Sequence, residues 1–271
     1  MISFPNSKIN LGLRVLDERS DGYHNIETIF YPIPLCDALE FVEADKSAKE
    51  DTLTTSGLVI DTKGDNLVIK AIRKFREVKE IPFLKVHLHK VIPMGAGLGG
   101  GSSDASYIIK SLNNYYGNAL SEELLEKISL EIGSDCPFFI KNAPALAQGR
   151  GEILKPIPQI LKDKYIVLVN PGIHISTKEA YQNCVSHNYT SSLDDLINEP
   201  ISEWNHLIYN DFEEYVFDTY PQIGKLKRLL YQAKATYSSM TGSGSSIYGI
   251  YEEKPSLPPE LTKRVVFEGF L

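Results

Sequence analysis

Cysteine is scarce in this chain: its 271 residues contain three, Cys36, Cys136 and Cys184. They lie far apart and form no C-x-x-C pair, so the sequence has neither the spacing of a disulfide framework nor that of a zinc knuckle. Such sparse, unpaired cysteines are typical of proteins in a reducing compartment. We therefore expect a cytoplasmic protein.

Long hydrophobic runs are also missing. No apolar run approaches the roughly 20 residues that a membrane-spanning helix needs. The first residues, MISFPNSKINLGLRV, lack the apolar stretch of a signal peptide and the Arg- and Ser-rich composition of a transit peptide. We expect a chain that begins directly with folded sequence and has no membrane partner.

The sequence has no excess of positive charge, since its formal net charge is −7. This balance argues against general nucleic-acid binding, which usually needs a basic face. It does not argue against an anionic substrate, because a local site can be positive on an acidic protein. The proportions of hydrophobic residues (42%) and charged residues (23%) are ordinary for a globular protein, and the length suggests about two domains.

Hydrophobic periodicity predicts alternating strands and helices without a strict βαβ repeat, which indicates two α+β domains, each with a mixed or antiparallel sheet covered by helices. We place the boundary in the Pro-rich stretch LKPIPQILKD, giving domains 1–157 and 158–271. Residues 46–57 are expected to be loop, and residues 186–200 form a polar segment. Strands are expected at 8–16, 26–33, 37–44, 57–60, 83–89, 138–140, 165–172, between residue 233 and the turn TGSGSS, at 247–251 and at 265–271. Helices are expected at 66–78 (capped by Asp65), from about 103 to 116, at 122–132, 176–184 and 223–233.

The stretch PMGAGLGGGSSDAS, residues 93–106, holds five of the 19 glycines and runs into helix-forming sequence. One or two glycines suffice for a surface turn, so five indicate a backbone that must approach something closely. A strand, a glycine loop and a helix start together form an anion site, because the free N–H groups and the helix dipole point at the loop.

Three familiar nucleotide loops do not fit this stretch. Gly95 to Gly100 matches G-x-G-x-x-G, but Pro93-Met94 separates the strand from the first glycine, and Glu122 and Glu123 open a helix instead of ending a strand. No Gly-Lys-Ser/Thr follows the glycines, which excludes a Walker loop. The companion motifs of protein kinases are also missing.

The remaining pattern, P-x-x-x-G-L-G-x-x-S-S, resembles the ATP-phosphate loop of the GHMP kinases. The resemblance implies the two-domain GHMP kinase fold and an ATP cradle of backbone N–H groups. It assigns this cradle to Pro93, Met94, Gly95, Ala96, Gly97, Leu98, Gly99, Gly100, Gly101, Ser102 and Ser103. Asn66 is expected near the adenine, and Mg²⁺ is expected to arrive with ATP, with Ser102 or Ser103 able to offer an oxygen.

Further blocks are similar to the 4-diphosphocytidyl-2-C-methyl-D-erythritol kinase family within this superfamily. They are SKINLGLRV, RSDGYHNIETIF, GSDCPFF, NPGIHISTKEAY and TGSGSSIYGIY, and they occur in the family's order between residues 7 and 251. The sequence departs from the family at Ala96, which replaces a frequent glycine, and at Ser134 and Cys136, where Ala and Val are common. The implied substrate is a small molecule, a cytidine diphosphate-linked methylerythritol.

The resemblance implies that Lys8 and Asp135 form the catalytic pair. Asp135 would orient the acceptor hydroxyl and take its proton, while Lys8 would keep Asp135 ionised and stabilise developing charge. Taken alone, Lys8 reads as a solvated charge and Asp135 as a turn residue. Only their place in the matching blocks favours catalysis.

The same resemblance supplies candidate substrate contacts. Tyr23 and Tyr181 would stack on the cytosine with Phe30 nearby, His24 would hydrogen-bond the base, and Asn10 would bind the erythritol part. Phe30 and Tyr181 are alternatively core aromatics, and His24 is alternatively a turn residue. Thr241, Gly242, Ser243 and Gly244 would close over the substrate, although TGSGSS also fits a tight hairpin.

Other functions stay open at this point. One alternative is another GHMP kinase, for homoserine or mevalonate; the Tyr23-His24 turn argues against it, because those substrates have no base to bind. The other alternative is a catalytically silent nucleotide-binding protein; the presence of both Lys8 and Asp135 argues against it. His87 and His89 share one strand face, but no third ligand accompanies them and Lys85 lies on the same face, so no metal centre is expected.

Overall fold

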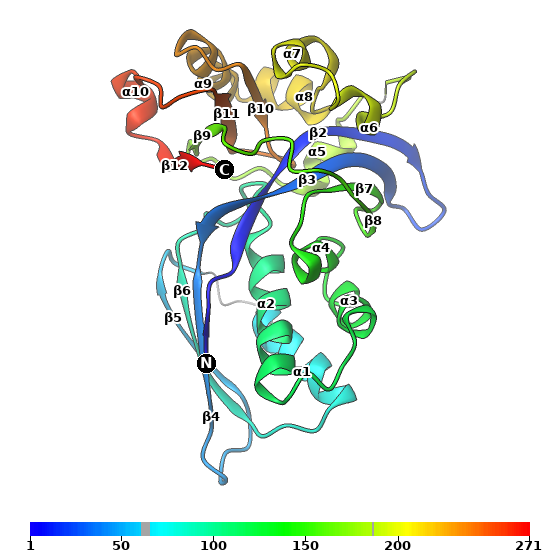
Figure 1. Ribbon diagram of the computed structural model, residues 1–271, viewed down its shortest axis with the longest axis vertical. Coiled ribbons are helices and arrows are strands. Elements are labelled where there is room, and N and C mark those ends of the chain that lie inside the picture. The colour runs from blue at the N-terminus through cyan, green and yellow to red at the C-terminus, as the bar shows by residue number, and fades with distance from the viewer. Residues whose placement is uncertain (61–65, 186) are drawn as a thin grey trace. The chain divides into compact units, whose positions relative to one another are not determined.

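The computed structural model describes residues 1–60, 66–185 and 187–271, and these divide into two compact units (Figure 1). Unit 1 consists of Met1–Ser7, Pro34–Met94 and Gly99–Ala143, and unit 2 of Lys8–Ile33, Gly95–Leu98 and Pro144–Leu271. The units are interleaved along the chain because the strands β2 (Asn6–Glu18) and β3 (His24–Cys36) each belong to both. The sequence-based boundary after residue 157 stays a prediction.

Unit 1 is a mixed sheet with helices on one face, as Figure 1 shows. The strand order is β1-β4-β6-β5; β1–β4 and β4–β6 are antiparallel, whereas β5–β6 is parallel. The core lies between this sheet and the helices, with Phe41 and Leu88 from strands and Phe75 and Ile108 from helices. The elements are β1 (Ile2–Ser3), β4 (Ala38–Glu43), β5 (Thr52–Gly57), β6 (Leu84–Lys90), α1 (Leu67–Val78), α2 (Gly100–Tyr115), α3 (Glu122–Leu130) and α4 (Cys136–Lys141).

Unit 2 contains two sheets, with the strand orders β2-β3-β7-β8 and β10-β11-β9-β12. Its core includes Val167 and Ile247 from strands and Phe212, Ile223 and Leu226 from helices. Besides β2 and β3, its elements are β7 (Ala145–Gly149), β8 (Ile153–Pro156), β9 (Tyr165–Val169), α5 (Thr177–Gln182), α6 (Leu193–Leu196), the 3-10 helix Ile201–Glu203, α7 (Trp204–Leu207), α8 (Phe212–Thr219), α9 (Pro221–Gln232), β10 (Tyr237–Met240), β11 (Ile247–Tyr251), α10 (Pro259–Thr262) and β12 (Val265–Phe270).

The α+β prediction is confirmed, and two local expectations are wrong. The strand expected at 138–140 is the helix α4, which has Pro137 in its first turn. The strand expected at 57–60 lies earlier, at Thr52–Gly57, where a loop was expected; its side chains are mostly exposed, so no apolar alternation marks it. The helix expected from about residue 103 is present as α2 and begins three residues earlier, at Gly100. Asp65, the expected cap of α1, lies outside the described residues, and Asn66 caps that helix.

Unit 1 buries a cluster of three charged side chains. Lys90 ends β6 and is 2% exposed; its Nζ donates to Asp37 and, at 2.6 Å, to Oδ2 of Asp104. Asp37 and Asp104 are also buried. Burial raises the pKa of Asp104 to about 7. The positive charge of Lys90 lowers this pKa and the negative charge of Asp37 raises it further, but burial has the largest effect. Below about pH 7 the Asp104 carboxyl group is protonated.

Among the described residues, no helix is both long and apolar enough to cross a membrane.

The raised pKa predicts a pH-dependent stability that Asp104→Asn removes. The native protein holds a proton on Asp104 that the unfolded chain releases near its ordinary pKa of 3.8. Stability therefore falls as pH rises from about 4 to about 7. The Asn side chain does not titrate, so we expect the wild type to lose stability relative to Asp104→Asn between about pH 4 and pH 7, as measured by urea unfolding. Parallel pH profiles of the two proteins would contradict this.

Candidate active site

The glycine loop is built from backbone conformations that other residues rarely adopt. Gly95, Gly97 and Gly99 have φ angles of 59°, 78° and 69°. A Cβ on Gly97 would lie 1.8 Å from the carbonyl oxygen of Thr241, so no side chain fits there. Both residues belong to unit 2, where the loop backbone packs directly on the backbone of the distant TGSGSS turn. Gly97 is therefore required by a close approach of two backbones.

The loop leads into a helix start that no side chain caps. Gly99 is the N-cap of α2 in the left-handed conformation and makes no side-chain cap hydrogen bond. The first-turn N–H groups of such a helix attract an anion, and the helix dipole adds to this. Ser103, in that turn, is fully buried, and its Oγ has no hydrogen-bond partner among the residues that the structure describes. These features together fit a phosphate cradle.

A buried polar network connects the start of β2 to the glycine turn. Lys8 is 4% exposed, and its Nζ donates to Oδ1 of Asn10 at 2.6 Å. Asn10 donates from Nδ2 to Thr28 Oγ1 at 2.9 Å and from its backbone N–H to Thr241 Oγ1 at 3.0 Å. Thr241 Oγ1 in turn donates to the carbonyl oxygen of Gly97 at 2.9 Å. The ammonium of Lys8 is thus oriented by residues from β2, β3, the loop and the turn.

Phe30 forms one wall beside this lysine. The Nζ of Lys8 lies 4.7 Å from the centre of the Phe30 ring, which is 1% exposed. A cation over an aromatic face is stabilised where water is excluded. In this structure Phe30 supports the lysine from the core; its contact with the cytosine stays a prediction.

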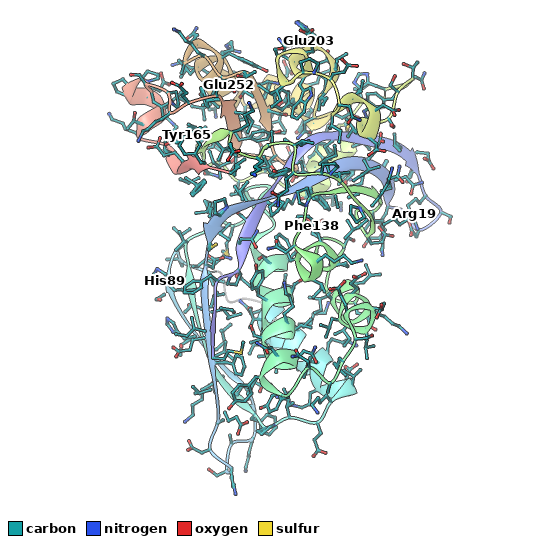
Figure 2. The ribbon with its side chains drawn as sticks, viewed as in Figure 1. Arg19, His89, Phe138, Tyr165, Glu203 and Glu252 are labelled. Carbon is teal, nitrogen blue, oxygen red and sulfur yellow. The ribbon has the colours of Figure 1, made fainter. Side chains whose placement is uncertain are left out.

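Asp135, the other member of the expected pair, belongs to unit 1 and is the N-cap of α4. The next residue, Cys136, is buried, and its carbonyl oxygen accepts a 2.7 Å hydrogen bond from Ser106 Oγ on α2. Burial raises the pKa of the Cys136 thiol to about 12, so it stays protonated at neutral pH. Phe138, labelled in Figure 2, is buried on the same short helix. The position of Asp135 is therefore fixed by a packed helix start rather than by a loose turn.

The aromatic candidates for base binding lie in unit 2. The rings of His24 and Tyr181 stack with centroids 5.4 Å apart and planes inclined by 23°. Tyr181 also packs edge-on against Phe212. Tyr23 is 56% exposed, with the guanidinium of Arg150 at 5.0 Å from its ring centre. The structure brings His24 and Tyr181 together, whereas Tyr23 presents its ring to solvent.

The TGSGSS turn connects β10 and β11, so its hairpin reading is confirmed. Gly242 and Gly244 have φ angles of 56° and 90°. The hydroxyl of Ser243 lies 3.1 Å from that of Thr177, at the start of α5. Its approach to the glycine loop at Gly97 is compatible with a second role beside bound substrate, which stays a prediction.

The remaining candidates have local roles in unit 1. Asn66 accepts the N–H of Val68 as the cap of α1, and its expected place near adenine stays a prediction. Pro93 is half-buried, and Met94 is 45% exposed. His87 and His89, the latter labelled in Figure 2, hydrogen-bond to Ser56 on β5. No group of three or more His, Cys, Asp or Glu able to hold a metal occurs among the described residues.

Two sets of supporting residues were not predicted from the sequence. Thr28 holds Asn10 and also donates to the carbonyl oxygen of Gly12, yet nothing in a strand pattern distinguishes it from other polar positions. Asp37 and Lys90 are likewise ordinary strand-end residues in sequence. Asp104 belongs to the stretch 93–106, and a carboxylate in the buried stripe of a predicted helix was the one signal that could have indicated this cluster.

Comparison with family models places both parts of the chain in one superfamily. Residues 66–142 match the GHMP kinases N terminal domain, and residues 192–260 match the GHMP kinases C terminal domain.

Full-length relatives agree with this match. The chain is 50% identical to a 4-diphosphocytidyl-2-C-methyl-D-erythritol kinase of Azobacteroides pseudotrichonymphae, over 95% of this chain and 96% of that one. It is 48% identical to the enzyme of the same name from Parabacteroides distasonis, over 93% and 92%. Among solved structures, a 4-(cytidine 5'-diphospho)-2C-methyl-D-erythritol kinase has a TM-score of 0.75 at 28% identity, covering 92% of this chain and 90% of that one.

A mevalonate kinase structure shares the fold at a TM-score of 0.70 and only 16% identity, over 99% of this chain and 98% of that one. The identity is about three times higher for the cytidyl kinases of Azobacteroides and Parabacteroides, at 50% and 48%. The chain therefore belongs to the GHMP kinases, in the family of the 4-diphosphocytidyl-2-C-methyl-D-erythritol kinases.

Proposed function

We propose that this ATP-dependent kinase transfers the γ-phosphoryl group of ATP to the 2-hydroxyl of 4-diphosphocytidyl-2-C-methyl-D-erythritol. The products are the 2-phosphate and ADP, and the reaction belongs to non-mevalonate isoprenoid precursor synthesis. The observation that carries the proposal is the 46–50% identity to relatives of this name over 93–99% of the chain. A cytoplasmic location is part of the proposal, in keeping with the free thiols of Cys36, Cys136 and Cys184.

The residues of the glycine loop fit ATP with Mg²⁺. The backbone of Gly95 to Gly101 and the uncapped start of α2 provide N–H donors for phosphate oxygens. The hydroxyl of Ser102 or Ser103 would supply an oxygen to the metal, and the Oγ of Ser103, which has no hydrogen-bond partner among the described residues, supports such a role. When bound, Mg²⁺ neutralises phosphate charge. Asn66 would lie near the adenine.

The catalytic roles fall to Lys8 and Asp135. Asp135 orients the acceptor hydroxyl for in-line attack and accepts its proton as the new P–O bond forms. The ammonium of Lys8, buried and aimed by Asn10, stabilises negative charge that develops during transfer. Because Lys8 is excluded from bulk water, this electrostatic effect is stronger than at a surface. Asn10 would also contact the erythritol part.

The cytidyl group would be recognised by aromatic stacking and hydrogen bonding. Tyr181 and Tyr23 would stack on the cytosine, with Phe30 nearby and His24 bonded to the edge of the base. The turn Thr241 to Gly244 would contact the substrate through its backbone. A substrate without a base would leave these groups unused.

The acceptor and the catalytic pair are tested together by ADP release. We expect turnover with the cytidyl substrate and none with mevalonate or homoserine. Asp135→Asn should lower kcat by about 10²–10⁴-fold, because its amide cannot accept the hydroxyl proton. Lys8→Met should lower kcat by about 10²–10³-fold. A coupled ADP assay measures all of these.

Circular dichroism and thermal unfolding of both variants serve as the control for folding. Turnover with mevalonate alone would overturn the substrate, and full activity in Asp135→Asn would overturn the mechanism.

Base stacking is tested at Tyr181. Tyr181→Leu should raise KM for the cytidyl substrate by about 10–100-fold, since loss of one stacking partner costs roughly 1–3 kcal/mol. KM for ATP should stay unchanged. Tyr181→Phe is the matched control, because it keeps the ring and its packing on Phe212, and it should behave as wild type. An unchanged cytidyl KM in the Leu variant would show that Tyr181 is a core residue only.

A further inference from the structure

The buried charges of Lys90, Asp37 and Asp104 lie at the base of the glycine loop. We propose that this cluster, here called the clasp, consists of positioning residues that hold the two ends of the loop together in the form that binds ATP phosphates. The proposal rests on the proposed function of the loop and adds residues that do not touch the nucleotide.

The entry to the loop is fixed by Asp37. This residue lies between β3 and β4, and its Oδ1 accepts the backbone N–H groups of Val91 at 2.5 Å and Ile92 at 2.8 Å. These are the two residues that follow β6 and precede Pro93. Its other oxygen accepts from Lys90, and its own N–H donates to the carbonyl of Pro5 at 2.9 Å. The chain therefore leaves β6 in one fixed direction.

The residues that follow the loop are also held by the ammonium group of Lys90. Lys90 Nζ donates at 2.6 Å to Asp104, which lies in the second turn of α2. A Cβ on Gly100 would lie 3.0 Å from this Nζ and 2.9 Å from Cγ2 of Ile92. The first residue of the helix thus packs directly on the lysine and on the entry segment. The residue before the loop, Ile92, and the residue after it, Gly100, are therefore both held next to the buried ammonium of Lys90.

Stability alone does not account for the clasp. Burying three ionisable groups costs desolvation free energy that ion pairing often fails to recover, and apolar residues of similar volume are frequently as stable. The cluster also has two carboxyl groups for one amino group, and Oδ1 of Asp104 has no hydrogen-bond partner in the described parts of the chain. A charged cluster does, however, specify one arrangement of its surroundings. The arrangement specified here is the spacing between Ile92 and Gly100.

Loss of the exit contact should therefore weaken ATP binding more than it changes the chemical step. The variant Asp104→Ala removes this contact and leaves Lys90 paired with Asp37, so the remaining charges balance. We expect the Kd of a non-hydrolysable ATP analogue, measured by calorimetry without acceptor, to rise about tenfold, because misplaced binding groups lose affinity. KM for ATP should rise equally, with kcat within about threefold of wild type and KM for the acceptor unchanged.

Two further variants separate positioning from stability. Asp104→Asn keeps an oxygen that can accept from Lys90 and should restore the Kd to within about twofold of wild type. Asp51→Ala is the matched control: Asp51 is 4% exposed at its side chain, pairs with Arg76 and accepts the N–H of Leu84 at the opposite end of β6. It should lower the Tm and leave the Kd unchanged.

An unchanged Kd in a folded Asp104→Ala variant would overturn the proposal, as would an equal rise in Asp51→Ala. If the Ala variant does not fold, Asp104→Val fills the same space without oxygens and should show the same rise; a wild-type Kd there would equally overturn the proposal. The calorimetry needs no acceptor, so it tests the clasp separately from the proposed function. An unchanged Kd would overturn the clasp even if the wild type phosphorylates the cytidyl substrate. A raised Kd would support the clasp even if the acceptor is a different molecule.

Discussion

The backbone of Gly97 lies so close to that of Thr241 that a single added carbon would be 1.8 Å from a carbonyl oxygen. This approach joins two glycine-rich stretches that are 144 residues apart in sequence. It also places Thr241 where its hydroxyl accepts the N–H of Asn10, and Asn10 orients the ammonium of Lys8. The position of the candidate catalytic lysine thus depends on a backbone contact at which Gly97 has no room for a side chain.

Backbone groups and charged side chains have different roles in this structure. Backbone N–H groups at the start of α2 form the candidate phosphate cradle, so the anion can be bound without an exposed Walker lysine. The buried charges act indirectly: Lys8 is held by an amide and an aromatic ring, and Lys90 by two carboxylates. This division would let a protein of net charge −7 offer the proposed local site to a polyphosphate.

Sequence predicted the parts whose cause is local. The apolar alternation of β6 and the stripe of α1 follow directly from periodicity, and the glycine loop follows from an unusual run of residues. Sequence did not predict β5, because its stability comes from parallel pairing with β6 rather than from its own apolar residues. It also missed Thr28 and the pairing of Asp37 with Lys90, since contacts across 18 and 53 residues leave no local pattern.

The central claim, that this kinase phosphorylates an alcohol of a cytidyl substrate, is tested most directly by identifying the product. Phosphorus NMR of a reaction with ATP and 4-diphosphocytidyl-2-C-methyl-D-erythritol should show one new phosphomonoester, coupled to the erythritol part, and an unchanged diphosphate linkage. A product with a lengthened phosphoanhydride chain, or ADP formed without any phosphorylated acceptor, would contradict the account.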